Sequence, residues 1–236
     1  MFLYILIYIY NMQKLLFSKE NPLKLINTNK KVIFNFLNVE SLWHFKNTKY
    51  YNSLILNKNN INFPDGKFVS NKLKVPQQRG PSFTKNYLKS LEAKSKKHFV
   101  IGNCTGKELS VVTNIPLKNI KVYSPSFINK IIFSDVEKNK IASLLALFKP
   151  DFVWVAIGAP KQEILSNQLY LKYACNYINI GAAIDFLTNK KLEAPKFFRI
   201  LYLEWFYRLI TDFKRSRKKV FRSIVGLRYL KYISVK

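Results

Sequence analysis

A carboxylate on a tight turn is the first feature of the sequence that could do chemistry. Asp65 stands in Pro64-Asp65-Gly66, in which the proline fixes φ and the glycine accepts a positive φ. A carboxylate held on such a turn can take the proton of an attacking hydroxyl and so act as a general base. It can equally be a structural residue whose side chain hydrogen-bonds to the backbone of its own turn, and the sequence leaves both interpretations open.

A second candidate site follows an apolar run at 152–157, which predicts a strand buried on both faces. Gly158 and the alanine after it are small enough to let a ligand approach the backbone. Pro160 precedes a predicted helix at about 161–172, whose N-terminus would offer free N–H groups to a phosphate. Strand, turn and helix together predict a binding site for a phosphorylated ligand.

Four further residues near predicted strand ends extend this candidate site. Gln162 can donate to and accept from the edge of a sugar or a base. Glu163 can bind hydroxyls or act as an ordinary acid in the first turn of a helix. Gly102 ends another predicted strand. Asp185 follows a third one, where it can bond to a ligand hydroxyl or cap the next helix.

The elements that must position these residues alternate along the chain. Predicted strands lie at 31–37, 98–102, 120–123, 152–157 and 177–181, and predicted helices at about 39–45, 106–113, 135–148 and 161–172. This alternation predicts an α/β fold with a Rossmann-like parallel sheet flanked by helices. Such sheets bind ligands beyond the carboxyl ends of their strands, where Gly102, Gly158 and Asp185 fall. The segment 57–66 is predicted to be a polar stretch ending in a turn, and 70–83 a loop.

The C-terminal segment differs in composition from the rest of the chain. Residues 196–236 carry twelve lysines and arginines against two acids. One predicted helix has its basic side chains on the face opposite its apolar ones: Arg215, Lys218, Lys219 and Arg222 against Phe213, Val220, Ile224 and Leu227. This pattern predicts a helix in a membrane interface, with a packed helix and a solvated basic face as the alternative. We therefore expect an uncertain segment at 1–30, an α/β core at 31–195 and a basic helical appendage at 196–236.

The chain of 236 residues carries a formal net charge of +27. Such a charge favours polyanionic partners, namely nucleic acid, an anionic bilayer or phosphorylated substrates. The base composition of the coding DNA could also account for part of the excess of lysine, and so for part of this charge. The two cysteines and two histidines fit no metal-ligand spacing, so we expect neither a metal nor a cofactor.

The apolar run at 2–10 is shorter than the roughly 20 residues that span a bilayer, and it lacks the pattern of a signal peptide. A start at Met12 would make this run a translation artefact. Because no later segment has spanning length, we expect a cytoplasmic protein that is free or attached to a membrane surface.

Three linked motifs, in order and at matching spacing, resemble the WecG/TagA/CpsF glycosyltransferases, glycosyltransferase family 26. They are Pro150-Asp151-Phe152-Val153-Trp154-Val155-Ala156-Ile157-Gly158-Ala159-Pro160-Lys161-Gln162-Glu163, then Gly181-Ala182-Ala183-Ile184-Asp185-Phe186-Leu187 with Ala194-Pro195, then Leu203-Glu204-Trp205-Phe206-Tyr207-Arg208-Leu209. Upstream, Phe63-Pro64-Asp65-Gly66 is similar to the Pro-Asp-Gly element of that family, and Arg79-Gly80 to its arginine loop.

The resemblance implies an inverting, metal-independent transfer of N-acetylmannosamine or its uronate type. The sugar would pass from UDP to a polyprenyl-diphosphate-linked sugar, in teichoic acid, common antigen or capsule synthesis. Asp65 would be the general base and Gln162 would lie in the substrate pocket. The appendage would bind to the cytoplasmic face of the plasma membrane. It would also supply Arg208 and Arg215 to the active site, where these two arginines and Arg79 could stabilise the leaving diphosphate. Exposed apolar surface on the appendage could also serve a homo-oligomer.

The chain departs from the family pattern at several positions. Phe36 stands where a threonine is usual, Asp212-Phe213 replaces Glu-Pro, and Lys218 replaces an arginine. These differences leave open a non-catalytic, membrane-bound paralogue of the same fold. A nucleic-acid-binding protein is a weaker alternative, because no recognised nucleic-acid module accompanies the charge and we expect no nucleic acid partner.

Overall fold

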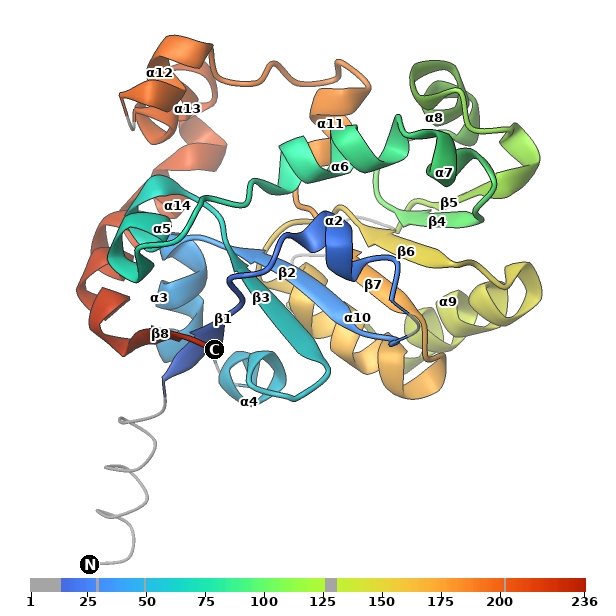
Figure 1. The fold of residues 1–236 in the computed structure, drawn as a ribbon, viewed down its shortest axis with the longest axis horizontal. Helices are drawn as coiled ribbons and strands as arrows, with labels where there is room; N and C mark the ends of the chain where they lie inside the picture. Colours follow the sequence, from blue (N-terminus) through green and yellow to red (C-terminus); the bar gives the residue numbers. More distant parts are fainter. Residues whose placement is uncertain (1–13, 29, 49, 126–130, 202) are drawn as a thin grey trace, which may run out of the picture.

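The fold is a parallel α/β sandwich built on a six-stranded sheet in the order β3-β2-β7-β6-β4-β5 (Figure 1). The structure is a computed structural model that describes residues 14–28, 30–48, 50–125, 131–201 and 203–236, without the side chains of 199, 205, 208 and 215. The apolar run at 2–10 lies outside the described residues. Every strand pair in the large sheet is parallel, which confirms the predicted fold class.

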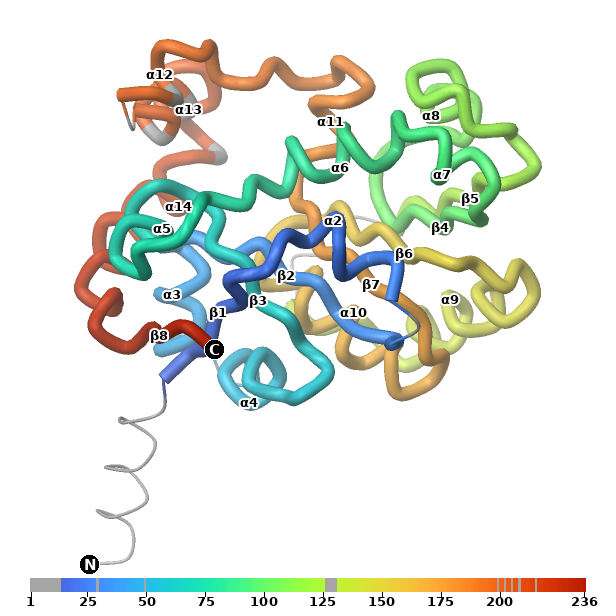
Figure 2. Tube along the Cα trace, in the orientation of Figure 1, coloured from blue at the N-terminus to red at the C-terminus, as the bar shows by residue number. Residues whose placement is uncertain are grey.

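The strands are short and largely buried, as expected for a sheet covered on both faces. Their bounds are β2 Ile33–Leu37, β3 Asn60–Pro64, β4 His98–Ile101, β5 Ile120–Tyr123, β6 Phe152–Val155 and β7 Asn176–Asn179. A separate two-stranded parallel sheet joins β1, Leu15–Phe17, to β8, Ile233–Val235. Figure 2 shows that the two ends of the described chain therefore lie side by side.

Helices cover both faces of the sheet (Figure 1). One layer contains α2 Pro22–Leu25, α6 Gly80–Leu88, α7 Leu91–Lys94, α8 Gly106–Thr113 and α11 Ala183–Leu187, and the other α4 Tyr51–Ile55, α9 Asp135–Phe148 and α10 Lys161–Lys172. A third group lies at the β3 side: α3 Val39–Asn47, α5 Lys67–Leu73 and α14 Phe213–Gly226, followed by the 3₁₀ segment η2 Leu227–Tyr232. The remaining helical segments are η1 Leu117–Asn119, α12 Lys196–Ile200 and α13 Glu204–Thr211.

The two segments predicted to lack regular structure differ from expectation. Within 57–66 lies β3, an edge strand that pairs with β2. The predicted loop at 70–83 was wrong for most of its length, because α5 extends to Leu73 and α6 begins at Gly80. Pro81 does not break α6, since it occupies the first turn, where a missing N–H costs no hydrogen bond.

A row of buried asparagines explains why β3 is hard to recognise. Asn35 of β2 donates to the side-chain oxygens of Asn60 and Asn62 in β3 at 2.9 and 3.0 Å. Its own oxygen accepts from Asn179 of β7 at 2.7 Å, and Ser166 of α10 bonds to Asn179 at 2.6 Å. These amides satisfy one another, so the polar row is buried without orphaned groups on Asn35 or Asn179.

Helix α14 is seated on α3, the helix that starts at the carboxyl end of β2. Gly226 allows the closest approach, because a methyl group there would lie 2.0 Å from the carbonyl oxygen of Val39. Further along, the Arg222 guanidinium lies 5.0 Å from the centre of the Trp43 ring and 3.7 Å from Glu40 Oε1. The position of α14 relative to the sheet is therefore set by backbone packing as well as by charge.

No helix within the described part of the chain is long and apolar enough to cross a bilayer.

Candidate active site

A cleft of about 1310 Å³ opens beyond the carboxyl ends of the strands, between the sheet and the C-terminal helices. It is lined from three directions. The sheet side supplies residues that follow β2, β3, β6 and β7: Asn38, Val39, Glu40, Asp65, Gly66, Lys67, Ile157 and Ala182. The α6 and α11 side supplies Gln77, Arg79, Pro81, Phe186, Lys191, Leu192 and Ala194. The C-terminal helices supply Ile200, Glu204, Tyr207, Ser216, Lys219, Val220, Ser223, Ile224 and Leu227.

Asp65 lies in this cleft, directly after the last residue of β3. Its backbone N–H donates to the carbonyl of Leu37 at 2.9 Å, which fixes the turn to the end of β2. Gly66 follows with φ of +89° and starts α5, so the predicted turn is confirmed. The carboxylate is partly exposed, as a proton acceptor must be if a substrate is to reach it.

Two glycines leave the sheet edge open in the loops after β6 and β7, although neither glycine itself lines the cleft. Gly158 and Gly181 have φ of +81° and +56°, and a methyl group on either would meet no atom of the described residues within 4 Å. Their neighbours Ile157 and Ala182 line the cleft. Gly102 differs, because a methyl group there would lie 3.0 Å from Ala156 Cβ. We attribute its small size to packing between β4 and β6.

Gln162 and Glu163 are buried beneath the cleft and do not line it. The N–H of Gly181 donates to Gln162 Oε1 at 2.9 Å, and Gln162 Nε2 donates to Glu163 Oε1 at 2.8 Å. Pro160, also buried, occupies the N-cap position of α10. In this arrangement Gln162 holds the loop after β7 against the start of α10, and so fixes the open edge at Gly181.

Burial raises the pKa of Glu163 to about 7, and Glu163 Oε2 has no hydrogen-bond partner among the described residues. The unfolded carboxyl ionises near its ordinary value of 4.5, so between the two values the folded state binds more protons. The contribution of Glu163 to folding stability is therefore fully present below about pH 4.5. It is lost as the pH rises through 7, and the free energy of unfolding falls by up to roughly 3 kcal/mol.

Glu163→Gln keeps the size of the side chain and removes its charge. We expect the stability of this variant, relative to the original protein, to increase as the pH is raised from 4.5 to 8, by up to roughly 3 kcal/mol. Urea unfolding at several pH values checks this. Identical pH dependence in the two proteins would show that Glu163 is not the titrating group.

Arg79 connects α6 to the segment before α12 and to α13. Its Nη2 lies 2.7 Å from Glu193 Oε1 and 3.8 Å from Glu204 Oε1. Arg79 therefore lines the cleft while paired with carboxylates, and a phosphate would have to compete with them for the guanidinium. Asp185, in the first turn of α11, is paired with Lys191 and is absent from the cleft lining.

The two arginines expected from the C-terminal segment belong to α13 and α14. Arg208 lies on α13 and Arg215 on α14, but both side chains are outside the described part of the structure. The sequence pattern did not single out Asn38 or Glu40 as cleft residues. Asn38 is also the N-cap of α3: its Oδ1 accepts from the N–H of Ser41 at 3.2 Å.

The chain matches the model of the "Glycosyl transferase WecG/TagA/CpsF family" over residues 8–233. It belongs to this glycosyltransferase family.

Individual relatives match over shorter stretches. A Staphylococcus aureus (strain NCTC 8325 / PS 47) protein named N-acetylglucosaminyldiphosphoundecaprenol N-acetyl-beta-D-mannosaminyltransferase is 33% identical over 85 residues, or 35% of this chain and 33% of the relative. A protein of the same name from strain MRSA252 is 36% identical over 87 residues, with the same coverage. The matched segment thus spans about a third of the length of these relatives.

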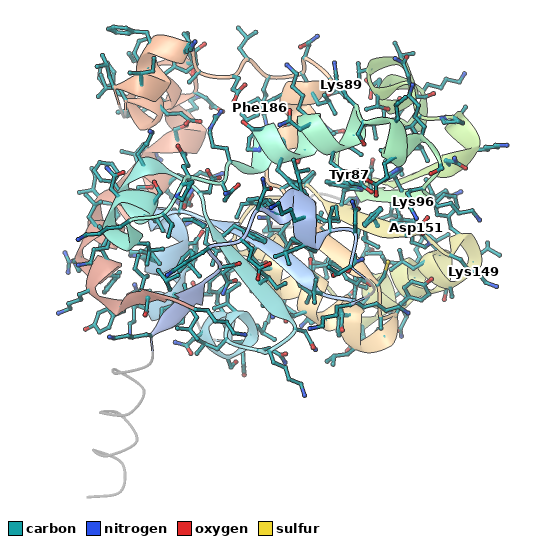
Figure 3. The ribbon with its side chains drawn as sticks, viewed as in Figure 1. Tyr87, Lys89, Lys96, Lys149, Asp151 and Phe186 are labelled. Carbon is teal, nitrogen blue, oxygen red and sulfur yellow. The ribbon has the colours of Figure 1, made fainter. Side chains whose placement is uncertain are left out.

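In this WecG/TagA/CpsF family chain, Phe36 is part of a buried aromatic cluster. Its ring lies 5.5 Å from that of Phe63 and 5.1 Å from that of Phe83. Tyr87, labelled in Figure 3, continues the cluster to Trp154 at 5.8 Å. The departure at Phe36 therefore adds to the core under α6, and the ring leaves no hydroxyl at this strand end.

Proposed function

We propose that the chain is an inverting glycosyltransferase that moves N-acetylmannosamine, or its uronate type, from UDP to a polyprenyl-diphosphate-linked sugar. The observation that carries this proposal is that Asp65 shares one cleft with the open loops after β6 and β7 and with the C-terminal helices. The family supports sugar transfer, and the names of the Staphylococcus aureus relatives support N-acetylmannosamine as the sugar and a polyprenyl-diphosphate-linked acceptor.

In the proposed reaction Asp65 takes the proton of the attacking hydroxyl on the acceptor sugar. The hydroxyl oxygen forms a bond to the anomeric carbon of the donor while the bond from that carbon to the UDP oxygen breaks. The bonding electrons leave with UDP, and attack from the opposite face inverts the anomeric centre. Charge then develops on the diphosphate, and the cations at the cleft would stabilise it.

The cleft suits an acceptor with both polar and apolar parts. Asp65 on its sheet side and Arg79 at the start of α6 are its polar part, whereas its outer side presents large apolar side chains that remain more than half exposed: Leu192, Ile200 and Ile224. Phe186 of α11, labelled in Figure 3, lines the same cleft. A sugar diphosphate bound near the sheet would leave its lipid directed toward this apolar side.

The outer surface of the C-terminal helices supports a peripheral position on a membrane. Large apolar side chains that are more than half exposed and do not line the cleft lie on α12, α13 and α14: Phe197, Ile210, Phe213 and Phe221. Lys214, Arg217 and Lys218 are exposed on α14 among them. Apolar side chains can enter the interface while lysines and arginines bind anionic headgroups. These residues support our proposal that the chain works at the cytoplasmic face of the plasma membrane.

Metal independence is a prediction of this mechanism, because arginine and lysine would carry the diphosphate charge. Three or more clustered metal-ligating side chains are not found in the described part of the chain. We expect a millimolar chelator to leave the initial rate of transfer unchanged within experimental error. A rate that falls sharply with chelator and recovers with Mg²⁺ or Mn²⁺ would contradict the prediction.

The donor is tested with a panel of UDP-N-acetylhexosamines, a synthetic prenyl-diphosphate-N-acetylglucosamine and product analysis by mass spectrometry. We expect UDP-N-acetylmannosamine or its uronate to give product. Product from UDP-N-acetylglucosamine alone would retain the transferase proposal and overturn its donor.

A further inference from the structure

Gln162 joins the two loops that form the open edge of the sheet. Its backbone N–H donates to the carbonyl of Gly158, in the loop after β6, at 3.1 Å. Its side-chain Oε1 accepts from the N–H of Gly181, in the loop after β7, at 2.9 Å. Ile157 and Ala182, the neighbours of these glycines, line the cleft. The orientation of one buried amide therefore contributes to the shape of the cleft wall.

The Gln162 amide can hold Gly181 in only one of its two orientations. Its oxygen must face the N–H of Gly181, so its NH₂ group must point away from Gly181 and needs an acceptor there. Glu163 Oε1 is that acceptor, at 2.8 Å from Gln162 Nε2. In the reversed orientation the NH₂ group would meet the N–H of Gly181, and two donors would face each other without an acceptor.

The Glu163 side chain makes few other polar contacts. Glu163 is 1% exposed, and within the described part of the chain its only hydrogen bond to another side chain is the one from Gln162, because Oε2 has no partner. Tyr51 of α4 and Glu40 of α3 are near enough to act on its charge or to be acted on by it, yet neither donates a hydrogen bond to it. A buried carboxyl with a single bond adds little to stability, so its contact with Gln162 is the main thing this side chain supplies.

The backbone beneath both side chains is held by other residues. The Ser166 hydroxyl donates to the carbonyl of Gln162, and Asn167 Nδ2 donates to the carbonyl of Glu163, each at 2.8 Å. Burial raises the pKa of Glu163 to about 7, so near neutral pH much of the group is the uncharged acid, whose carbonyl oxygen accepts as an amide oxygen does. An uncharged acceptor at position 163 should therefore orient Gln162 while α10 keeps its place.

We infer that Glu163 is a positioning residue, which orients the Gln162 amide and through it holds the loop after β7 at the cleft. For its effect on catalysis the inference rests on the proposed function and deepens it. Glu163 acts through Gln162 and not on a substrate, because it is absent from the cleft lining. A displaced cleft wall would misplace the proposed substrates, and a misplacement of about 1 Å can lower the rate by about 10²-fold.

The test compares Glu163→Leu with Glu163→Gln, two uncharged replacements of similar size of which only glutamine offers an acceptor. We expect Glu163→Leu to lower kcat/KM for sugar transfer by about tenfold to a hundredfold, and Glu163→Gln to stay within about threefold of the original protein. Hydrogen exchange of the Gly181 amide should be at least about fivefold faster in Glu163→Leu, because its bond to Gln162 is lost, and unchanged in Glu163→Gln. Glu163→Met, unbranched like glutamate, takes the place of Glu163→Leu if the leucine variant does not fold.

A double variant tests the route of the effect. Gln162→Ala and the combined Gln162→Ala/Glu163→Leu should differ by less than about twofold in kcat/KM, since a residue that acts only through Gln162 has no effect once that side chain is removed. If the second substitution instead lowers kcat/KM as much as Glu163→Leu does alone, Glu163 acts independently of Gln162 and the inference is overturned.

Two other results would also overturn the inference while the transferase proposal stands. Equal losses of kcat/KM in Glu163→Leu and Glu163→Gln would mean that the carboxyl itself is required, and unchanged Gly181 exchange in Glu163→Leu would mean that Gln162 needs no acceptor at position 163. If the original protein transfers no sugar from any donor, while Gly181 exchange is faster in Glu163→Leu and unchanged in Glu163→Gln, the proposed function fails and the positioning by Glu163 stands.

Discussion

Replacing Asp65 by asparagine is expected to lower the rate of sugar transfer by about 10²- to 10⁴-fold, the range associated with loss of a general base. The amide keeps the size of the side chain and, with the N–H of Asp65 still bonded to Leu37, the turn should persist. Affinity for UDP should change by less than about threefold, because the lost group acts on the acceptor hydroxyl. Initial rates and UDP calorimetry on the same preparation measure both quantities.

Asp135→Asn is the matched control for Asp65→Asn. Asp135 lies in the first turn of α9, is largely exposed and is paired with Lys138, away from the cleft lining. Its substitution should leave the transfer rate unchanged. Transfer by the Asp65 variant at the original rate would contradict the assigned role, and normal UDP binding without transfer in the original protein would favour the non-catalytic paralogue.

Replacing Gly226 by alanine is expected to displace α14 and to reduce transfer by about 10²-fold, the loss associated with a misplacement of about 1 Å. The added methyl group would lie 2.0 Å from the carbonyl oxygen of Val39, and a backbone atom cannot move aside as a flexible side chain can. Overpacking of this kind typically costs about 1–3 kcal/mol, so the core should remain folded. Transfer rates and thermal unfolding are measured together.

Gly106→Ala provides the control for the glycine substitution. Gly106 begins α8, far along the chain from α14, and a methyl group there would lie 3.2 Å from Leu117 Cδ1, the end of a flexible side chain. Transfer should stay within about twofold for this variant, since Leu117 can shift by a few tenths of an ångström. If Gly226→Ala transfers sugar at the original rate, the close packing of α14 on α3 is not needed for catalysis.

Much of the sheet could be predicted because buried parallel strands appear in the sequence as short continuous apolar runs. The apolar runs of β4 and β6 and the helices α8, α9 and α10 follow the expected alternation closely. Strand β3 was missed because it carries Asn60, which is half-buried, and Asn62, which is buried, and both accept hydrogen bonds from Asn35 of another strand. Such pairing depends on tertiary neighbours that a local pattern does not contain.

The candidate site was predictable in its location and less so in its detail. Because the carboxyl ends of parallel strands meet at one edge, the loops at Gly158 and Gly181 were expected to converge. The burial of Gln162 and Glu163 depends on the rotation of α10 against the sheet, which the sequence pattern does not specify. The rotation of α14 is likewise not specified by the sequence pattern. The close packing of Gly226 against Val39 sets this rotation, and Lys219 then lines the cleft.

The central claim is most directly tested by the mass of the acceptor after reaction. The protein is incubated with UDP-N-acetylmannosamine and a short prenyl-diphosphate-N-acetylglucosamine, and acceptor mass and released UDP are measured over time. The proposed function predicts addition of one N-acetylhexosamine residue per acceptor, with one UDP released for each. UDP released without any change in acceptor mass, or neither product across the donor panel, would contradict it.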